Sequence, residues 1–388
     1  MNVAAPVPVS PVPASPAGSE RLLRASAVEP LAPAWDELAG RLGAPPFLRP
    51  GWIAAWWRAF GRGALEIRAL ERDGRLAGVL PLVRRRGALR AAMNCHTPQF
   101  GLLAEDPGAA SALARSLFAG GPRRVSIASL AAADPGLGTC RRAAEEAGYR
   151  LLVRRLQRSP YLEVDGDWEG YESGLSRNLA IDLRRSRRRL EALGELSFEA
   201  ADGRERLEEL LREAFAVEAS GWKGRRGTAI RSRADTRRFY TEIARWAAGE
   251  GALRLFFLRL DRRAIAMYYA LETAGVRHLL KGGYDPAWRR FSPGKLLMRE
   301  VLAHGFATGV SRIELHGSAE AYKLRWARAV QERKLFEAFS PSPAGRLAWT
   351  VLAYGRPAAR RLLRGRPGGS IGSGAAPLPE PSWSDQPT

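Results

Sequence analysis

The sequence is poor in the residues from which metal sites and disulfide frameworks are built. It contains two cysteines, Cys95 and Cys140, and four histidines in 388 residues. Two isolated cysteines exclude a disulfide framework and a thiolate metal site, and histidines scattered along the chain give no ligand set at metal-binding spacing. We therefore predict that the protein binds no metal.

Long apolar runs are missing as well. No window of the chain approaches the ~18 uninterrupted apolar residues that indicate a transmembrane helix. The N-terminus also lacks the charged segment and apolar core of a signal peptide. These absences predict a cytoplasmic protein without a transmembrane segment. The hydrophobic fraction of 46% is that of a globular protein, and 388 residues suggest two domains.

The net charge is strongly positive, with 61 basic and 40 acidic residues giving +21. Such a charge raises encounter rates with any polyanion without identifying which one. It is densest at 177–189, where six arginines accompany one acid, Asp182. Leucines at helical spacing, at 179, 183, 190 and 193, predict an amphipathic helix with a basic outer surface. A solvated face and a groove for CoA or RNA phosphates are both compatible with this pattern.

Composition divides the chain into four parts. Residues 1–20 form a Pro-rich tail and residues 356–388 a tail that is first basic and then rich in Gly, Pro and Ser, and neither tail can bury enough apolar surface to fold. Residues 21–160 and 161–355 are predicted as N-terminal and C-terminal domains. The segment 347–363 is apolar on one face, which suggests a helix docked on the catalytic domain or a peripheral contact with a membrane surface.

The predicted elements occur in the same order twice, at a spacing of roughly 190 residues. The order is three strands, a helix, a strand, a helix and a strand, which indicates two copies of one α/β domain with a mixed sheet. The strands of the first copy are predicted at 65–71, 75–83, 100–104, 124–129 and 150–156, and its helices at 107–118 and 137–147. Those of the second copy are predicted at 253–260, 264–272, 276–281, 312–315 and 334–339, with helices at 293–308 and 319–329.

The helix after the third strand begins differently in the two copies. The first copy has Glu105-Asp106-Pro107-Gly108, whose carboxylates satisfy the helix dipole and repel an anion. The second copy has Ser292-Pro293-Gly294-Lys295, with two further basic residues just before it. A helix N-terminus of this kind favours phosphate. We therefore predict a cofactor phosphate site in the second copy, made by Arg289, Arg290, Ser292, Gly294 and Lys295, and a first copy that forms one wall of the substrate cleft.

Four segments together resemble a known family. They are 47–60, 218–228, 281–295 and 317–326, and they are similar to the GNAT acyltransferase superfamily, in its double-domain branch of CelD-like acetyltransferases and Fem-type peptidyl transferases. The phosphate loop of that superfamily reads Gln/Arg-x-x-Gly-x-Gly/Ala. This chain has Arg289-x-x-Ser292-x-Gly294, so a serine replaces the first glycine and the geometry of the loop departs from the pattern.

The resemblance implies an α/β fold of two tandem GNAT-like domains, the second of which carries the acyl-CoA site. It implies an N-acyltransferase that moves an acetyl or other acyl group from acetyl-CoA or a related acyl-CoA to an amine on a small-molecule or saccharide-linked acceptor. The Fem-type members instead imply an aminoacyl-tRNA donor. An RNA-dependent transferase or RNA-binding protein is therefore the alternative, although the basic segment 177–189 has no aromatic residue for base stacking.

Direct attack of an amine on a thioester requires proximity, a proton acceptor and an N–H donor for the developing oxyanion. The resemblance implies that this donor is a backbone amide on the strand before the phosphate turn, where two strands splay apart. We expect Gly282-Gly283 to distort that strand, 276–281. Tyr284 and Tyr322 are candidates to return a proton to the leaving thiolate.

Three further residues are catalytic candidates. His316 follows a strand on the side that faces the cleft, so it is either a general base or a structural histidine. Asp285 precedes a proline and either orients the acceptor amine or bonds its own backbone in a turn. Lys281 ends a strand and either contacts cofactor or substrate or pairs with Asp285 or Glu320.

Four residues are predicted to contact the substrate. Trp222 and Lys223 belong to a segment in which glycines alternate with basic residues, a pattern typical of a mobile loop with exposed charge. Glu320 stands where it could cap the next helix, and Lys323 lies one turn from Trp326 on that helix. We predict that Trp326 packs in the core and that Lys323 faces the cleft.

Overall fold

The computed structural model describes residues 20–355. Both predicted tails, 1–20 and 356–388, lie outside this range apart from Glu20, which begins the first strand. The described part is built on a 13-stranded mixed sheet. From one edge to the other, the strands are β1 (Glu20–Ala25), β2 (Ala64–Arg72), β3 (Arg75–Arg85), β4 (Ala88–Ala91), β6 (Arg124–Ala131), β13 (Ala329–Phe339), β7 (Arg150–Glu163), β12 (Arg312–Glu314), β11 (Val276–Tyr284), β10 (Arg263–Thr273), β9 (Leu253–Leu260) and β8 (Leu196–Ala201), with β5 (Leu103–Ala104) paired to β3.

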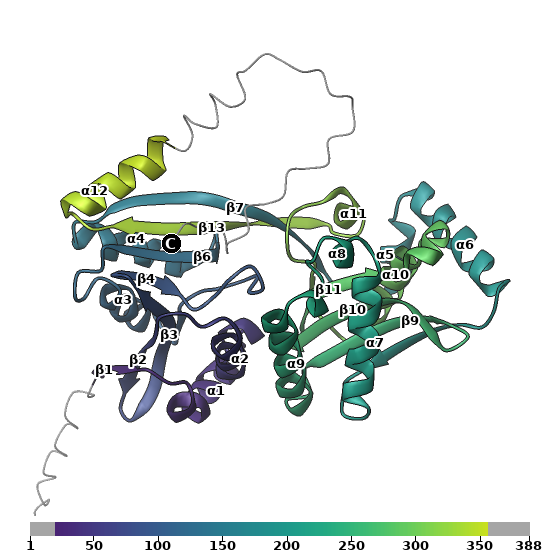
Figure 1. Cartoon of the computed structure of the whole chain (residues 1–388), viewed down its shortest axis with the longest axis horizontal. Helices are drawn as coiled ribbons and strands as arrows, with labels where there is room; N and C mark the ends of the chain where they lie inside the picture. The colour runs from purple at the N-terminus through teal and green to yellow at the C-terminus, as the bar shows by residue number, and fades with distance from the viewer. Residues whose placement is uncertain (1–19, 356–388) are drawn as a thin grey trace, which may run out of the picture.

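The strand order shows two units that exchange their last strands. β7 ends the first unit but pairs with β12 of the second, and β13 ends the second unit but pairs with β6 of the first. The two exchanged strands also pair with each other along nearly their whole length, so they bridge the two units (Figure 1). The predicted repeat of two α/β units is confirmed. The predicted boundary between residues 160 and 161 lies inside β7, and the division into domains at this point stays a prediction.

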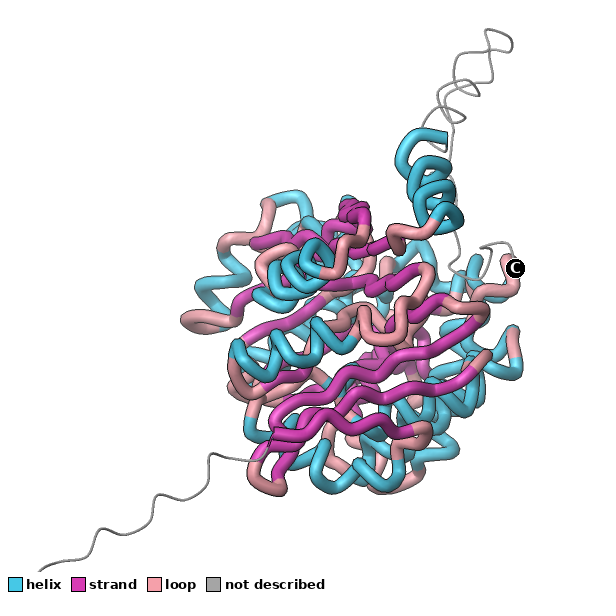
Figure 2. The backbone as a smooth tube through the Cα atoms, turned by 90° about the vertical axis from the view of Figure 1, so that its left-hand side faces the viewer, coloured by secondary structure: helices cyan, strands magenta, loops and turns pink. Residues whose placement is uncertain are grey.

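The first unit has two helices between β1 and β2 in the chain and two that follow the predicted repeat. They are α1 (Ala32–Arg41), α2 (Pro50–Phe60), α3 (Pro107–Ser116) and α4 (Pro135–Glu146). Trp35 of α1 and Trp52 of α2 are fully buried, since both helices turn their aromatic side chains to the core. Figure 2 shows helices on both sides of the strands. The strand predicted at 100–104 is wrong in extent, because only Leu103–Ala104 pairs with β3, and the short strand β4 also pairs with β3.

The helices of the second unit surround the predicted site. They are α5 (Trp168–Ser173), α6 (Arg177–Glu191), α7 (Leu207–Ser220), α8 (Trp222–Arg225), α9 (Ala234–Gly249), α10 (Pro293–Ala307) and α11 (Ala321–Leu324). The predicted basic helix α6 is confirmed: three of its leucines are buried against the core, at 179, 183 and 190, while Leu193 is exposed. The helix predicted at 319–329 is too long, because the chain enters β13 at Ala329. Trp326 is buried in the core, as predicted.

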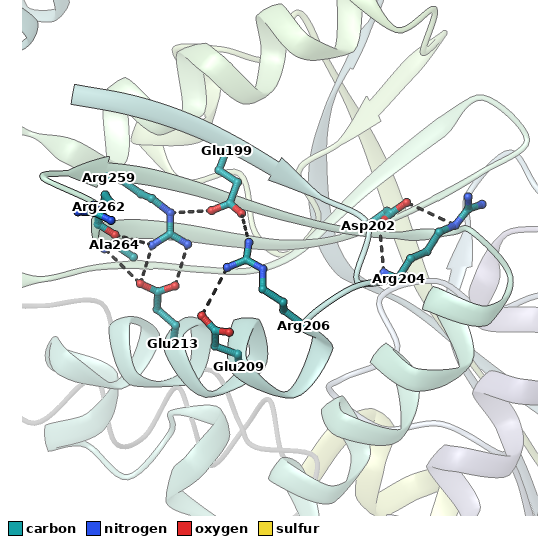
Figure 3. Close-up of polar contacts among 9 residues, drawn as sticks. All are labelled: Glu199, Asp202, Arg204, Arg206, Glu209, Glu213, Arg259, Arg262 and Ala264. Atoms are coloured by element: carbon teal, nitrogen blue, oxygen red, sulfur yellow. Dashed lines mark hydrogen bonds and ion pairs between the residues drawn. The ribbon is translucent and has the colours of Figure 1, made fainter. Parts of the chain in front are cut away.

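An ion-pair network holds α7 against the edge of the sheet (Figure 3). The Arg259 guanidinium on β9 donates to both carboxylate oxygens of Glu213 on α7, at 2.7 and 2.8 Å, and to Glu199 on β8 at 2.6 Å. Arg206 donates to the other oxygen of Glu199 at 3.1 Å. Bidentate pairs of this kind fix orientation as well as distance. The network therefore sets the position of α7, whose far end reaches the centre of the second unit.

The last described helix lies on the first unit. α12 (Pro343–Thr350) continues into the π-helical turn Val351–Gly355 and contacts β7 and β13. The indole N–H of Trp349 donates to the carbonyl of Leu151 at 2.9 Å. The described part of the predicted helix thus docks on β13 of the predicted catalytic domain and on β7 of the first unit, and the remainder, 356–363, lies outside the described residues. Leu347, Val351 and Tyr354 are exposed.

Candidate functional site

Two neighbouring strands of the second unit, β11 and β12, separate at their carboxyl ends. β11 and β12 are parallel and paired at Val276–His278 against Arg312–Glu314, and the last pair joins His278 to Glu314. β11 then continues from Leu279 to Tyr284 without a partner in β12. Backbone N–H and C=O groups on that side of β11 are therefore released from the ladder. The splay implied by the resemblance is present on the predicted strand.

The distortion of β11 lies at a different residue from the one predicted. Tyr269 of β10 pairs with Lys281 and Ala270 pairs with Leu279, so Leu280 is an extra residue in a β-bulge. Gly282 and Gly283 serve close packing instead. A Cβ on Gly282 would overlap the Tyr268 ring, and a Cβ on Gly283 would lie 2.7 Å from the Cα of Glu218 on α7. The distortion of β11 is therefore the bulge at Leu280, just before the two glycines.

The helix that follows β11, α10, has an uncapped N-terminus at the same end of the sheet. Ser292 precedes α10 with a left-handed backbone, φ 49°, and its side chain forms no capping hydrogen bond. Pro293 has no N–H, and the N–H of Gly294 has no partner among residues 20–355. A Cβ on Gly294 would lie 3.3 Å from the Tyr284 ring. This terminus therefore offers a free amide and a small residue to an incoming anion.

The equivalent helix of the first unit is closed. The Asp106 carboxylate accepts the N–H of Ala109 at 2.8 Å and pairs with Arg72 at 2.5 Å. The Arg72 guanidinium and that hydrogen bond lower the pKa of Asp106, so the capping group carries its charge. The predicted contrast between the two helix starts is confirmed.

The basic residues around the open terminus come from three elements. Arg289 and Arg290 lie on the 3₁₀ helix η4 (Pro286–Phe291), and the Arg290 guanidinium lies 4.7 Å from the ring centroid of Phe291. Lys295 on α10 lies 3.4 Å from the Asp182 carboxylate on α6. The structure thus brings all five predicted phosphate residues to one turn. It also brings the basic helix α6 to that turn.

Two histidines meet beside the splay, although they are far apart in sequence. Nδ1 of His278 lies 3.1 Å from Nε2 of His316, and the two rings are stacked with an interplanar angle of 6°. The other ring nitrogens, Nε2 of His278 and Nδ1 of His316, have no hydrogen-bond partner. Phe47, on η2 (Pro46–Leu48) of the first unit, packs its ring against the edges of both imidazoles. Both units therefore contribute to this cluster.

The His316 imidazole is held in a buried and electropositive setting. Burial lowers its pKa well below the usual range, and the neighbouring His278, Arg333 and Lys323 lower it further. Burial also lowers the pKa of His278 to about 3, assisted by Arg333. Both rings are neutral near pH 7, so His316 has a lone pair available to accept a proton. Oε2 of Glu314 lies 4.0 Å from its Nδ1 and would attract the resulting cation.

Asp285 and Lys281 are explained by other contacts. The Asp285 carboxylate accepts the N–H of Ala287 at 3.0 Å and pairs with Arg263 at 2.7 Å, which favours the turn role left open by the sequence. The Lys281 ammonium lies 5.3 Å from the ring centroid of Tyr240 on α9, rather than beside Asp285 or Glu320. Burial and the nearby Lys223 charge lower the pKa of Lys281. Lys281 therefore faces α9.

The segment of alternating glycine and basic residues is folded. Residues 222–225 form the helical turn α8, and a Cβ on Gly224 would overlap the carbonyl of Ala219, so the predicted loop is wrong. Lys223 donates to the carbonyl of Gly282 on β11 at 2.6 Å and pairs with the buried Glu218 at 3.2 Å. Trp222 is 54% exposed beneath Arg226. Lys223 thus reaches the splayed strand, and Trp222 stays at the surface.

The short helix α11 closes the loop after His316. Lys323 donates to the carbonyls of His316 at 2.9 Å and Ser318 at 3.4 Å, and it pairs with Glu320 at 3.2 Å. These contacts stabilise the left-handed backbone of His316, φ 49°. Glu320 forms no capping hydrogen bond, and Tyr322 is exposed on the same helix. Lys323 therefore holds the loop that carries His316.

Sequence reasoning missed His278 and Glu218. His278 has no motif of its own and occupies one position of an apolar strand, and Glu218 was given no role beyond its place in the segment 218–228. The pairing of β11 with β12 would have revealed the first, because it places residue 278 beside the residues that follow 314.

The sequence of this unit matches a family model. Residues 177–324 match the acetyltransferase (GNAT) domain. The chain is therefore similar to GNAT acetyltransferases over this segment. It is a transferase on this basis, and the matched residues include the bulged strand, the open helix terminus and His316. No curated protein matches the chain in sequence.

Solved structures share the fold of the GNAT domain together with the first unit. FemX has a TM-score of 0.61 at 13% identity, covering 81% of this chain and 98% of that one. The C-terminal domain of a putative lysylphosphatidylglycerol synthetase from Agrobacterium fabrum has a TM-score of 0.54 at 14% identity, covering 84% and 97%. A tandem GNAT protein from the clavulanic acid biosynthesis pathway has a TM-score of 0.45 at 13% identity, covering 84% and 100%. The fold of the described residues is thus mixed α/β with two similar units in tandem, and FemX shares it.

The described residues show neither a membrane span nor a metal cluster. Between residues 20 and 355, no helix is long and apolar enough to cross a bilayer. In the same range, no group of three or more His, Cys, Asp or Glu side chains is arranged to hold a metal ion.

Proposed function

We propose that the protein is an acyl-CoA-dependent N-acyltransferase that transfers an acetyl or related acyl group to an amine. One observation carries the proposal: the unpaired edge of β11 and the uncapped start of α10 lie at the same end of the sheet. In a β-α-β unit the helix begins where the first strand ends, so a ligand that contacts both can present a thioester to the strand and phosphates to the helix.

Each chemical requirement has a candidate residue. A backbone amide released near the Leu280 bulge would donate to the thioester oxygen as negative charge develops there. His316 would accept the proton of the attacking amine through Nδ1, since its Nε2 faces His278. Tyr284, whose ring lies against Gly294, would return a proton to the leaving thiolate. Tyr322 lies on α11 and is the weaker of the two tyrosine candidates.

The remaining candidates bind rather than react. Arg289, Arg290 and Lys295 would neutralise the donor phosphates around the turn. Lys223 fixes β11 through the Gly282 carbonyl, and Trp222 offers an exposed ring to an acceptor. The proposal includes a small-molecule or saccharide-linked amine as acceptor and a cytoplasmic location.

Calorimetric titration of the purified protein with CoA tests the donor. We expect one CoA per chain and a weaker complex when Gly294 is replaced. Mass spectrometry of ligands retained on purification gives an independent readout. Failure of CoA and acetyl-CoA to bind at millimolar concentration would contradict the proposal.

An aminoacyl-tRNA-dependent transferase is the second candidate. The basic surface of α6 beside the phosphate turn favours it, because a tRNA backbone would engage such a surface. Filter binding with aminoacyl-tRNA distinguishes the two. Tight tRNA binding that CoA does not displace would support this alternative over the acyl-CoA donor.

A further inference from the structure

A groove lined by arginines lies on the outer face of α6. Arg184, Arg185, Arg188 and Arg189 line it together with Ile181, and its volume is about 480 Å³. All four arginines are exposed. No carboxylate lines the groove, so its charge is entirely positive.

The described part of the fold provides no stabilising partner for most of these arginines. Within residues 20–355, Arg184, Arg185 and Arg188 have no ion pair or hydrogen bond, whereas Arg187 on the same helix pairs with Glu191 and Glu300. The pairs 184 with 188 and 185 with 189 place like charges one turn apart, which destabilises a helix. Arg188 and Arg189 lie in the last turn, where the helix dipole favours cations. Arg184 and Arg185 receive no such compensation.

The groove borders the phosphate turn. Asp182, one turn before Arg185, contacts Lys295 of α10 at 3.4 Å. At the other end, the guanidinium groups of Arg189 and Arg290 lie 4.9 and 4.7 Å from the ring centroid of Phe291. Figure 1 shows α6 beside α10. Asp182 neutralises Lys295 on one side, and positive charge therefore runs from the turn to the groove through Arg290 and Arg189 at Phe291.

We propose that this groove binds a phosphate monoester on the nucleotide half of the acyl donor, which for CoA is the 3′-phosphate. The inference rests on the proposed acyl-CoA function and adds a second anion subsite to it. A phosphate monoester carries about −1.5 to −2 charges at pH 7 and three acceptor oxygens. Arginine binds such a group with paired N–H donors.

Two other polyanions fit the groove less well. An RNA strand is held by stacking as well as by phosphate contacts, and no aromatic side chain lines the groove. A membrane-bound helix needs an apolar face, but Leu179, Leu183 and Leu190 of α6 are buried in the core. A compact phosphate in a short groove satisfies the arginines without either feature.

The experiment is a thermodynamic cycle between ligand and protein. CoA and 3′-dephospho-CoA are titrated calorimetrically into the parent, into R184Q/R185Q, and into R115Q/R141Q as a control. The control removes two exposed arginines from α3 and α4 of the first unit, so its change in net charge is the same. We expect the parent to prefer CoA by about tenfold, as a lost charge-assisted hydrogen bond would cause.

The arginine variant should bind 3′-dephospho-CoA as tightly as the parent does and should lose the preference for CoA. The control should keep it. Equal binding of CoA and 3′-dephospho-CoA by the parent would overturn the groove assignment while leaving the acyl-CoA function intact. Absence of CoA binding to the parent would overturn both. If R184Q/R185Q keeps the preference for CoA but loses tRNA in filter binding, the groove serves RNA and the assignment is wrong.

Discussion

Nδ1 of His278 lies 3.1 Å from Nε2 of His316, and this contact leaves Nδ1 as the nitrogen of His316 that is open to another group. One proton is shared across the contact. If His316 holds it on Nε2, its Nδ1 carries the lone pair, and His278 accepts through Nδ1. His278 thus orients His316 in the way that a third group orients the base of a catalytic triad. Phe47 fixes both rings from the first unit.

Replacing His316 should remove the proton acceptor. We expect His316→Gln to lower kcat by about 10²- to 10⁴-fold, as loss of a general base does, with the Kd for CoA little changed. Steady-state kinetics and CoA titration measure the two quantities. A variant with unaltered kcat and an unaltered pH–rate profile would remove His316 from the mechanism.

Replacing His278 tests its positioning role. His278→Asn keeps a hydrogen-bonding atom near the place of Nδ1, whereas His278→Phe removes it. We expect the Asn variant to retain most of kcat and the Phe variant to lose it, since only the former can hold the tautomer of His316. Circular dichroism should show both folded. Equal activity of the two variants would mean that the contact is structural.

The buried histidine pair should also make stability depend on pH. The pKa of His278 is lowered from 6.5 to about 3 and that of His316 is lowered as well, so the unfolded chain binds more protons between those values. Stability therefore falls as pH drops from 6.5 towards 3, by up to ~1.4 kcal/mol per pH unit for each histidine. Urea unfolding at pH 7, 6 and 5 measures this. His278→Asn should show a shallower dependence, and a slope identical to the parent would contradict the assignment.

The two helix starts provide a matched pair for CoA binding. Gly294→Val places side-chain atoms against Tyr284 at the open terminus of α10 and should weaken CoA binding at least about tenfold. Gly108→Val makes the same change at the capped start of α3, close to Asp106, and should leave CoA binding unaltered. Calorimetry compares them. Equal losses in both variants would indicate a general loss of folding instead.

In the ion-pair network on α7, the bidentate pair of Glu213 with Arg259 should contribute more to stability than the exposed Arg206. Glu213→Gln breaks the bidentate pair with Arg259 and should cost about 1–3 kcal/mol of unfolding free energy. Arg206→Gln removes a more exposed partner and should cost less than about 1 kcal/mol. Denaturant titration measures both. A larger loss for Arg206→Gln would show that the network is held together elsewhere.

Local patterns were sufficient to predict the elements around the phosphate turn. The strands β9, β10 and β11 have apolar residues and tight turns between them, and Pro293 marks the start of α10, so their positions follow from nearby residues. The difference between Asp106 and Ser292 was also readable, because capping depends on one side chain and its neighbours. The exact place of the bulge was not, since it depends on register with β10.

Features that depend on distant partners escaped prediction. The residues of β7 and β13 do not indicate which strands they pair with. The exchange of these strands between the units is visible only in the complete sheet. His278 was overlooked for the same reason, as its partner lies 38 positions away. The segment from Trp222 to Gly227 was misjudged because Gly224 permits close packing against the Ala219 carbonyl of α7.

The position of β13 has a consequence for how the polypeptide matures. β6 leaves the ribosome about two hundred residues before the strand that covers its open side, and translation proceeds at only about 5–20 residues per second. For many seconds the nascent N-terminal portion exposes an unprotected edge, a situation that invites pairing with another chain. A chaperone or the translating ribosome would have to shield that edge until the final strand arrives, and expression of residues 20–163 alone should give aggregates.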